Sequence, residues 1–148
     1  MKMGRLDRDS GPMRLPLVLG ESGLVVLDSS WGEIKPMKLA EGVRSVGELE
    51  VIDHLDAGLD LVDSRPFESH SQGTIPGARN VPHEEVVERI DELDPRRPAI
   101  FFCNGPQCGA SPDAISSLLE AGHPPRAILY YRGGLHDWVS LGLPVVAP

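Results

Sequence analysis

The sequence has few of the features that mark secreted, membrane or nucleic-acid-binding proteins. Only two of its 148 residues are cysteine, too few for the disulfide framework of a small secreted domain. No apolar run approaches the roughly 18 residues of a membrane-spanning helix. Asp and Glu outnumber Lys and Arg by 22 to 14, whereas phosphate binding needs clustered cations. We therefore expect a cytoplasmic protein that binds neither nucleic acid nor membrane.

The first forty residues lack helical periodicity. Two apolar segments, "LPLVL" and "LVVLDS", flank "GESG", a spacing typical of a hairpin. Acidic residues interrupt the basic start, and its apolar run is too short for the core of a signal peptide. We predict an N-terminal extension over residues 1–40 that can form a hairpin, followed by a single domain over residues 43–148.

Within that domain, predicted strands alternate with predicted helices. Short apolar segments predict strands at residues 59–64, 79–82, 98–103 and 126–131. Amphipathic or capped segments predict helices at residues 45–58, 83–93, 111–122 and 133–142. This alternation indicates an α/β domain whose parallel sheet is covered by helices on both faces.

Two of the predicted helices carry signals at their ends. Ser45 and Glu48 have the spacing of a reciprocal N-terminal cap, and Gly58 marks the end of that helix. Its apolar face is expected to comprise Val46, Leu49, Ile52 and Leu55. Ser111 is the expected N-cap of the third helix, and Gly122 its stop.

The segment "IFFCNGPQCGAS", residues 100–111, ends an apolar strand on Cys103. Ligands of parallel sheets bind at the carboxyl ends of strands, where such a thiol would lie. A thiol attacks as the thiolate, which backbone N–H groups and a helix N-terminus can stabilise. We expect Gly105 and Gly109 to adopt positive φ, and the small Ala110 to leave room, so that the loop amides surround the sulfur. The alternative is that Cys103 is a small buried hydrophobe.

Three segments resemble the signature stretches of the rhodanese (thiosulfate sulfurtransferase-like) family: "LVDSRPFESHSQGTIPGARNVP", "IFFCNGPQCGAS" and "LYYRGGLHDWVSLGLPVV". They occur in the order and spacing of that family, and the resemblance runs from about Val43 to the C-terminus. It implies a three-layer α/β domain with a central five-stranded parallel sheet flanked by helices. It also implies a sulfurtransferase that needs no cofactor and uses a small sulfur donor and a thiol or protein acceptor.

Carried over by position, the resemblance implies that Cys103 takes up a sulfane sulfur as a persulfide and passes it to a nucleophile. The active-site loop then comprises Asn104, Gly105, Pro106, Gln107, Cys108, Gly109 and Ala110. Asp63 and Arg65 match a pair that supports the fold close to the site in that family. Structural positions around the pocket are matched by Gly77, Gly133, Gly134 and Trp138.

The loop departs from the family pattern in its charge. Many members have Arg or Thr where this chain has Cys108, and "NGPQCGA" contains no Lys or Arg. Without a side-chain cation, dianionic thiosulfate is expected to be a poor donor, and a persulfide or polysulfide a better one. Arg132, in the neighbouring "YYRGG" turn, is the candidate to supply charge. Thr74 stands where the family commonly has histidine, so no histidine role is expected there.

Three interpretations of Cys108 remain open. It resolves a persulfide by forming a disulfide with Cys103, it is itself the nucleophile, or it is a spectator. The strand-end position favours Cys103 as the nucleophile, which leaves Cys108 an auxiliary or spectator role.

The five histidines lack the spacing of metal ligands, so no metal site is expected: His54, His70, His83, His123 and His136. His54 is predicted to be solvated in mid-helix, and His136 is the histidine expected near the pocket. The acidic segment "HEEVVERIDELD" is interpreted as a solvated helix face.

A chain of this kind has two alternatives to a sulfurtransferase. A non-catalytic module of the same fold would bind a partner without chemistry at its cysteine. A phosphatase would need arginine six positions after its cysteine to clamp phosphate, and this chain has Gly109 and Ala114 at those positions. The sequence therefore excludes the phosphatase and favours the enzyme, because the thiol is retained in a suitable loop.

Overall fold

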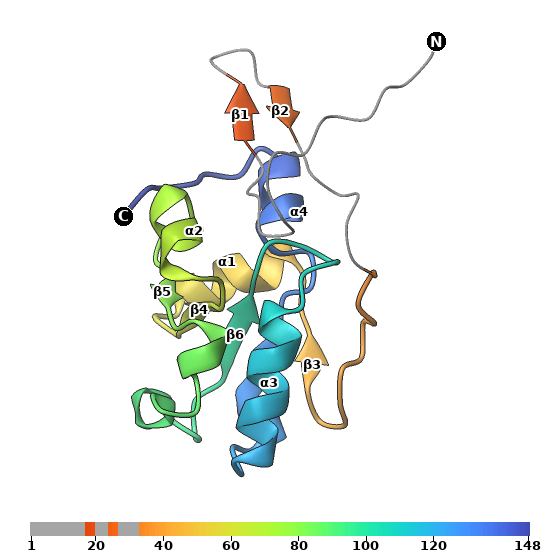
Figure 1. Cartoon of the computed structure of the whole chain (residues 1–148), viewed down its shortest axis with the longest axis vertical. Helices are drawn as coiled ribbons and strands as arrows, with labels where there is room; N and C mark the ends of the chain where they lie inside the picture. The colour runs from red at the N-terminus through yellow and green to blue at the C-terminus, as the bar shows by residue number, and fades with distance from the viewer. Residues whose placement is uncertain (1–16, 20–23, 27–32) are drawn as a thin grey trace.

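The structure is a computed structural model that describes residues 17–19, 24–26 and 33–148. In the N-terminal region, β1 (Leu17–Leu19) and β2 (Leu24–Val26) pair antiparallel, and they stand side by side at the top of Figure 1. These are the two segments expected to form a hairpin. The "GESG" segment between them lies outside the described residues.

The centre of the domain is a five-stranded parallel sheet (Figure 1). Its strands are β3 (Arg44–Ser45), β4 (Leu61–Asp63), β5 (Arg79–Asn80), β6 (Ala99–Phe102) and β7 (Ile128–Tyr130). They lie in the order β3-β7-β6-β4-β5, so that β6 is central and pairs with β4 and β7. The parallel sheet predicted from the sequence is confirmed.

Alternation of side chains along the strands produces two cores. Ile100 and Phe102 of β6 face one core, which α1 (Glu48–Asp56) and α4 (Gly134–Ser140) cover. Ala99 and Phe101 face the other core, which α3 (Ala110–Glu120) covers. Apolar burial on both faces explains why the strand reads as a continuous apolar run. The three-layer arrangement is therefore the expected one.

The start of α1 differs from the prediction. Ser45 belongs to β3, and the N-cap is Gly47, whose N–H donates to the Glu50 carboxylate at 3.2 Å. The buried face of α1 also differs from the predicted one, because Leu49 is 77% exposed while Val51 is fully buried. The cap assigned to Ser45 and the buried position assigned to Leu49 were both wrong.

The start of α3 also differs from the prediction, and its end does not. Gly109 is the N-cap, and Ser111 lies within the first turn, where its hydroxyl donates to the Ser64 hydroxyl at 3.1 Å. The cap assigned to Ser111 was therefore wrong. Gly58 and Gly122 follow the ends of α1 and α3 with φ of 73° and 91°, as the two stop signals predicted.

The helix predicted over residues 83–93 does not form. The segment contains two short 3-10 helices, η1 (His83–Glu85) and η2 (Ile90–Glu92). Between them, the Arg89 guanidinium donates to the Asn80 carbonyl of β5 at 3.2 Å. Val86 and Leu93 are buried in the core on the α3 side. Tertiary contacts of this kind override a helical pattern, because they hold the chain to the sheet edge at several points.

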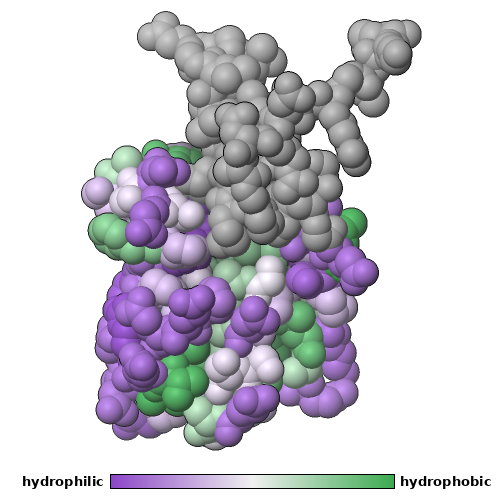
Figure 2. All heavy atoms as spheres, viewed as in Figure 1, coloured by the Kyte–Doolittle hydropathy of each residue, from purple (hydrophilic) through white to green (hydrophobic). Residues whose placement is uncertain are grey.

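One face of the molecule is mostly hydrophilic. On the face shown in Figure 2, charged and polar residues predominate, and the apolar areas are small and separate. Across the described ranges, no helix has the length and apolarity that a bilayer crossing would require.

Candidate active site

Cys103 directly follows β6, the central strand of the sheet, at its carboxyl end. Its side chain is 2% exposed. The N–H of Ser111, in the first turn of α3, donates to its sulfur over 3.3 Å. A strand end and a helix start thus meet at this thiol, the placement expected from the sequence.

The loop between the strand and α3 folds back on itself. The Cys108 N–H donates to the Gly105 carbonyl at 3.0 Å, with Pro106 and Gln107 between them. Proline is favoured at the second position of a β-turn of this kind. Because the turn reverses the chain, Cys108 returns to Cys103 and is buried with it and Ala110 in a small cluster.

The loop glycines have a role other than the one predicted. Neither Gly105 nor Gly109 has positive φ, and φ at Gly109 is −87°. Gly105 instead provides close approach, because a Cβ there would lie 2.8 Å from the His136 Cβ. Positive φ occurs at Gly134, at 61°, where a side chain would overlap the Cys103 carbonyl. The sequence identified glycines that the site needs, and it misassigned where the backbone is left-handed.

The electrostatic arrangement of the two sulfurs also differs from the expectation. Burial raises the pKa of the Cys103 thiol, as does the neighbouring Cys108, and the bonds from Ser111 oppose this only in part. The pKa of Cys108 is lowered to about 7 by its hydrogen bond with Cys103 and by the N–H groups of Ala110 and Asn104. Negative charge on the pair is therefore favoured at Cys108, first because of its neighbour Cys103 and burial of the Cys103 thiol, and further because of the loop amides.

A buried ion pair, Asp63 with Arg65, contacts the active-site loop through Asn104. Arg65 binds Asp63 through two hydrogen bonds, Nε to Oδ1 at 2.9 Å and Nη2 to Oδ2 at 2.7 Å, and both side chains are fully buried. Arg65 also donates to the Asn104 side chain at 3.4 Å, and its charge contributes to the lowered pKa of Cys108. A side-chain cation therefore acts on the sulfur pair, although the loop itself contains none.

Two further groups complete the shell around Asp63. The Thr74 hydroxyl donates to Oδ2 at 2.9 Å, and Nδ1 of His70 lies 3.0 Å from the same oxygen. Burial acts to raise the pKa of Asp63, but the bonds from Arg65 and His70 outweigh it, so the pKa is lowered. His70, to which the sequence assigned no role, therefore contacts the buried Asp63.

The Arg132 guanidinium binds residues outside the active-site loop. Its Nε donates to the Lys35 carbonyl at 2.6 Å, and Nη1 to the Met37 sulfur at 3.0 Å. The Lys35 N–H in turn donates to the Pro106 carbonyl at 2.7 Å. Residues 35–37, here called the strap, therefore tie the active-site loop to the turn that carries Arg132.

The remaining histidines take different places. His136 lies against the loop, where its backbone N–H donates to the Asn104 carbonyl at 2.7 Å, as its predicted place near the pocket implies. His54 is buried, with Nε2 2.8 Å from the Asp60 carbonyl, so its predicted solvated position was wrong. Burial lowers the pKa of both His54 and His123. His83 opens η1.

Two other expected positions support the fold at a distance from the sulfurs. Gly77 has φ of 88°. Trp138 lies in the core under α4, edge-on to Tyr131 with ring centroids 6.5 Å apart, and its Nε1 donates to the Pro144 carbonyl at 2.7 Å. Because that core is on the other face of the sheet from Cys103, Trp138 does not line the thiol.

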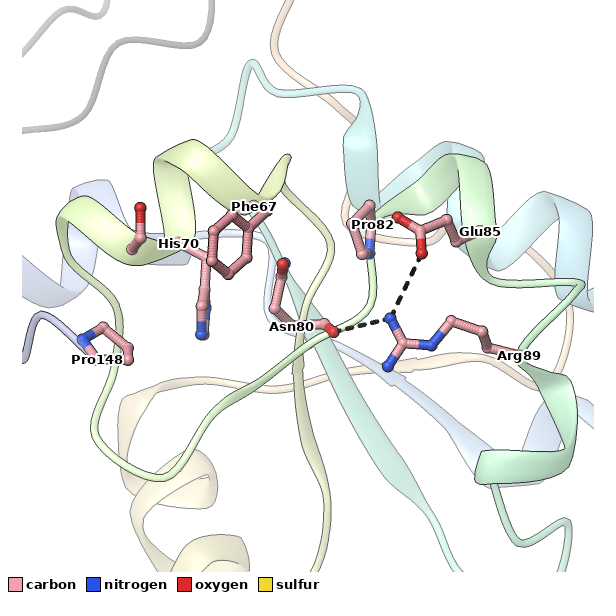
Figure 3. A pocket seen from close by; sticks show the side chains of 8 residues that line it. Phe67, His70, Asn80, Pro82, Glu85, Arg89 and Pro148 are labelled. Atoms are coloured by element: carbon pink, nitrogen blue, oxygen red, sulfur yellow. Dashed lines mark hydrogen bonds and ion pairs between the residues drawn. The ribbon is translucent and has the colours of Figure 1, made fainter.

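A pocket of about 550 Å³ opens at the β5 edge of the sheet, beside α2 (Phe67–Gln72) (Figure 3). Its lining is Phe67, His70, Ser71, Asn80, Pro82, Glu85, Arg89 and Pro148. The Arg89 guanidinium at its edge is bound to the Asn80 carbonyl and lies 3.7 Å from the Glu85 carboxylate. Neither cysteine lines this pocket, so it is separate from the thiol site. Among the described residues, no three His, Cys, Asp or Glu side chains gather as metal ligands.

Comparison with known proteins places this geometry in context. The family model described as the rhodanese-like domain matches residues 49–141. A sulfurtransferase of Allochromatium vinosum is 35% identical over 89 residues, which cover 60% of this chain and 78% of that protein. An HTH-type transcriptional regulator of Mycobacterium tuberculosis is 35% identical over 102 residues, which cover 68% of this chain and 44% of the regulator.

Solved structures agree with the fold. A thiosulfate sulfurtransferase from Pseudomonas aeruginosa is 33% identical with a TM-score of 0.58, over 70% of this chain and 20% of that one. A rhodanese-related protein from Thermoplasma volcanium is 23% identical with a TM-score of 0.60, over 71% of this chain and 99% of that one. This chain therefore spans less than half of the regulator and a fifth of the Pseudomonas enzyme.

Proposed function

This chain belongs to the rhodanese-like domain family, and on that premise we propose that it is a sulfurtransferase that carries a sulfane sulfur as a persulfide on Cys103. The observation that carries the proposal is the place of this thiol. It ends the central strand, and the first turn of α3 donates an N–H to its sulfur. Relatives named as sulfurtransferases support the class of reaction.

The reaction has two half-steps. Cys103 as thiolate attacks the terminal sulfur of a donor persulfide, R–S–SH, so that R–S⁻ leaves and Cys103–S–SH forms. An acceptor thiolate then attacks the outer sulfur, takes it as R′–S–SH, and leaves Cys103 as the thiolate. Sulfur, protons and charge balance in each half-step, and no cofactor takes part.

The second sulfur assists the first half-step by holding charge. At neutral pH the lower pKa of Cys108 leaves the negative charge of the pair on Cys108, which lies beside Cys103 in the buried cluster and accepts its proton as the attack begins. The departing R–S⁻ then removes that proton from the pair. Arg65, fixed by Asp63 beneath the loop, stabilises the negative charge throughout.

The donor that suits this site carries little charge. Arg65 is fully buried and bound to Asp63, and Arg132 is bound to the strap, so neither guanidinium is placed to clamp a dianion. We therefore expect a persulfide or polysulfide to be a better donor than thiosulfate. Steady-state rates with the two donors check this, and a preference for thiosulfate contradicts it.

Mass spectrometry tests the persulfide directly. After anaerobic incubation with a small-molecule persulfide, Cys103 should gain one sulfur atom in Cys108→Ser, which has no second thiol that could remove it. Cys103→Ser, which is nearly isosteric, should gain none on that residue while keeping the melting temperature of the native protein. Sulfur found on Cys108 with Cys103 unmodified would transfer the nucleophilic role to Cys108.

The second candidate is a non-catalytic module of the same fold that binds a partner. The observation that favours it is the Mycobacterium relative, a transcriptional regulator of which this chain matches 44%. The same experiment separates the two candidates, because a pure binding module would take up no sulfur on either cysteine.

A further inference from the structure

Cys108 is a buried thiol that forms no covalent bond when sulfur is transferred through Cys103 alone. Its side chain is 1% exposed and lies in the small cluster with Cys103 and Ala110. The turn closed by its N–H on the Gly105 carbonyl brings it there, since the chain reverses over Pro106 and Gln107. The second sulfur thus returns to the first within five residues of sequence.

The two cysteines lie beside each other in the buried cluster. The Cys103 thiol lies 3.6 Å from the Cys108 carbonyl oxygen, to which it donates, and the two side chains pack together in one buried cluster. Each sulfur is held by backbone amides, Cys103 by Ser111, and Cys108 by Ala110 and Asn104. Thiol–disulfide exchange needs a thiolate in contact with the sulfur it attacks, and this arrangement provides that contact.

We propose that Cys108 is the resolving thiol of the site: its thiolate attacks the inner sulfur of the Cys103 persulfide, closes a Cys103–Cys108 disulfide and expels the outer sulfur as hydrosulfide. The inference rests on the proposed function, because it starts from that persulfide. A bond forms between the two cysteine sulfurs, and the bond from Cys103 to the sulfane sulfur breaks. Its electron pair leaves with HS⁻, so the sulfane sulfur is reduced and the two cysteines are oxidised.

A dithiol reductant completes the cycle. It reduces the Cys103–Cys108 disulfide by exchange, becomes a disulfide itself, and restores both thiols. Resolution within the loop competes with transfer to an external acceptor, because the attacking sulfur is already in place whereas an acceptor must reach a buried one. The products with a persulfide donor are therefore hydrosulfide and a disulfide whenever no acceptor thiol is present.

A single-turnover experiment tests the proposal. The reduced full-length chain, kept free of oxygen, is loaded with one equivalent of a small-molecule persulfide and rapidly desalted. Hydrosulfide is then followed in solution, and the disulfide by peptide mass spectrometry. The native chain should release one hydrosulfide for each disulfide formed. Cys108→Ser should keep its Cys103 persulfide and release hydrosulfide at no more than roughly one tenth of the native rate.

Controls exclude other origins of the disulfide. The native chain without donor must stay reduced, because a disulfide formed there comes from an oxidant and contradicts the proposal. Ser116→Ala, at an exposed position of α3, should behave as the native chain. If Cys108→Ser fails to fold, as judged by thermal melting, Cys108→Ala takes its place.

The outcomes separate this inference from the proposed function. A stable Cys103 persulfide in both the native chain and Cys108→Ser overturns the inference and leaves the sulfurtransferase standing. Sulfur recovered on Cys108 also overturns it, because the thiolate has then attacked the outer sulfur. If folded Cys108→Ser takes up no sulfur on Cys103, and the native chain yields neither a persulfide nor hydrosulfide with a disulfide, both the inference and the proposed function fail.

Discussion

Tyr130 and Tyr131 are neighbours in the sequence and lie on opposite faces of the sheet. Their hydroxyls differ in hydrogen bonding. The Tyr131 hydroxyl donates to the Glu48 carboxylate at 3.0 Å. The Tyr130 hydroxyl is buried on the α3 side without a hydrogen-bond partner in the part of the chain that the structure describes. A buried polar group without a partner costs free energy, so the two positions should respond differently to loss of the hydroxyl.

The matched pair Tyr130→Phe and Tyr131→Phe measures this difference. Tyr131→Phe loses a hydrogen bond to a carboxylate and should lower the free energy of unfolding by about 1 kcal/mol. Tyr130→Phe removes an unsatisfied group and should leave that free energy within about 0.5 kcal/mol or raise it. Urea unfolding of the three proteins checks both values, and equal losses would show that the Tyr130 hydroxyl is satisfied in solution.

Arg65→Ala should be the most destabilising of the polar substitutions near the site. It leaves the fully buried Asp63 carboxylate without its main partner, a change that costs about 3–5 kcal/mol. Arg126→Ala, at an exposed position, is the control and should stay within about 0.5 kcal/mol of the native chain. Chemical denaturation at neutral pH measures both.

The pH dependence of the Arg65→Ala defect follows from the same pair. In the native chain the bonds from Arg65 and His70 lower the pKa of Asp63, so this stabilisation is present at neutral pH and is lost as pH falls through the folded-state pKa. Without Arg65, burial dominates and raises that pKa, so the carboxyl takes up a proton more readily. The stability gap between variant and native chain should therefore narrow as pH falls toward about 4. A constant gap would assign the defect to packing.

Gly134→Ala should disrupt the thiol loop itself. Gly134 has φ of 61°, and a Cβ there would overlap the Cys103 carbonyl and come within 2.9 Å of the Gly105 nitrogen. Gly142→Ala is a matched control, with φ of 75° and open space around the site of the added Cβ. The control should lose about 1–2 kcal/mol from the left-handed backbone alone, and Gly134→Ala more. If thermal or urea unfolding shows that the two variants lose similar free energies of unfolding, the thiol loop can shift to accommodate the added Cβ at little cost.

Alkylation of the two thiols should follow separate pH profiles. The thiolate fraction rises with pH, so Cys108 should react with a midpoint near pH 7, and Cys103 only at more alkaline pH. In Cys108→Ser the charged neighbour is gone, so the pKa of Cys103 falls and its profile moves to lower pH. Peptide-resolved mass spectrometry between about pH 5 and pH 10 checks both profiles. A Cys108 midpoint at or above about 8.5 would mean that the loop amides leave it as an ordinary thiol.

The sheet was predictable because a strand that is buried on both faces appears in the sequence as a continuous apolar run. The segments around β4, β6 and β7 are apolar runs bounded by glycine, proline or polar residues, and each became a strand. Residues 83–93 show the limit of such patterns. Val86, Ile90 and Leu93 have helical spacing, but the contacts that decide the local structure, such as that from Arg89 to Asn80, come from elsewhere in the chain.

The candidate site was predictable in position and less so in charge. The end of an apolar strand and the start of a helix placed Cys103 correctly. The return of Cys108 was signalled by "GPQC", which has proline in the second position of a turn, but a turn signal does not show which side chains then meet. His70 and Tyr130 gave no signal, because their roles depend on neighbours in space. Which of the two thiols has the lower pKa depends on their burial and on the direction of the loop N–H groups, and neither can be read from a sequence.

The strap sets a condition on how small an excised version of this domain can be. The region shared with the family, residues 49–141, omits Lys35, whose backbone contacts both Pro106 and Arg132. It also omits Val146, whose backbone forms two hydrogen bonds with that of Thr74, beside Asp63. A fragment cut at those limits would remove the Lys35 partner of both the Pro106 carbonyl and the Arg132 guanidinium. Recombinant boundaries should therefore begin before residue 35 and run past residue 146.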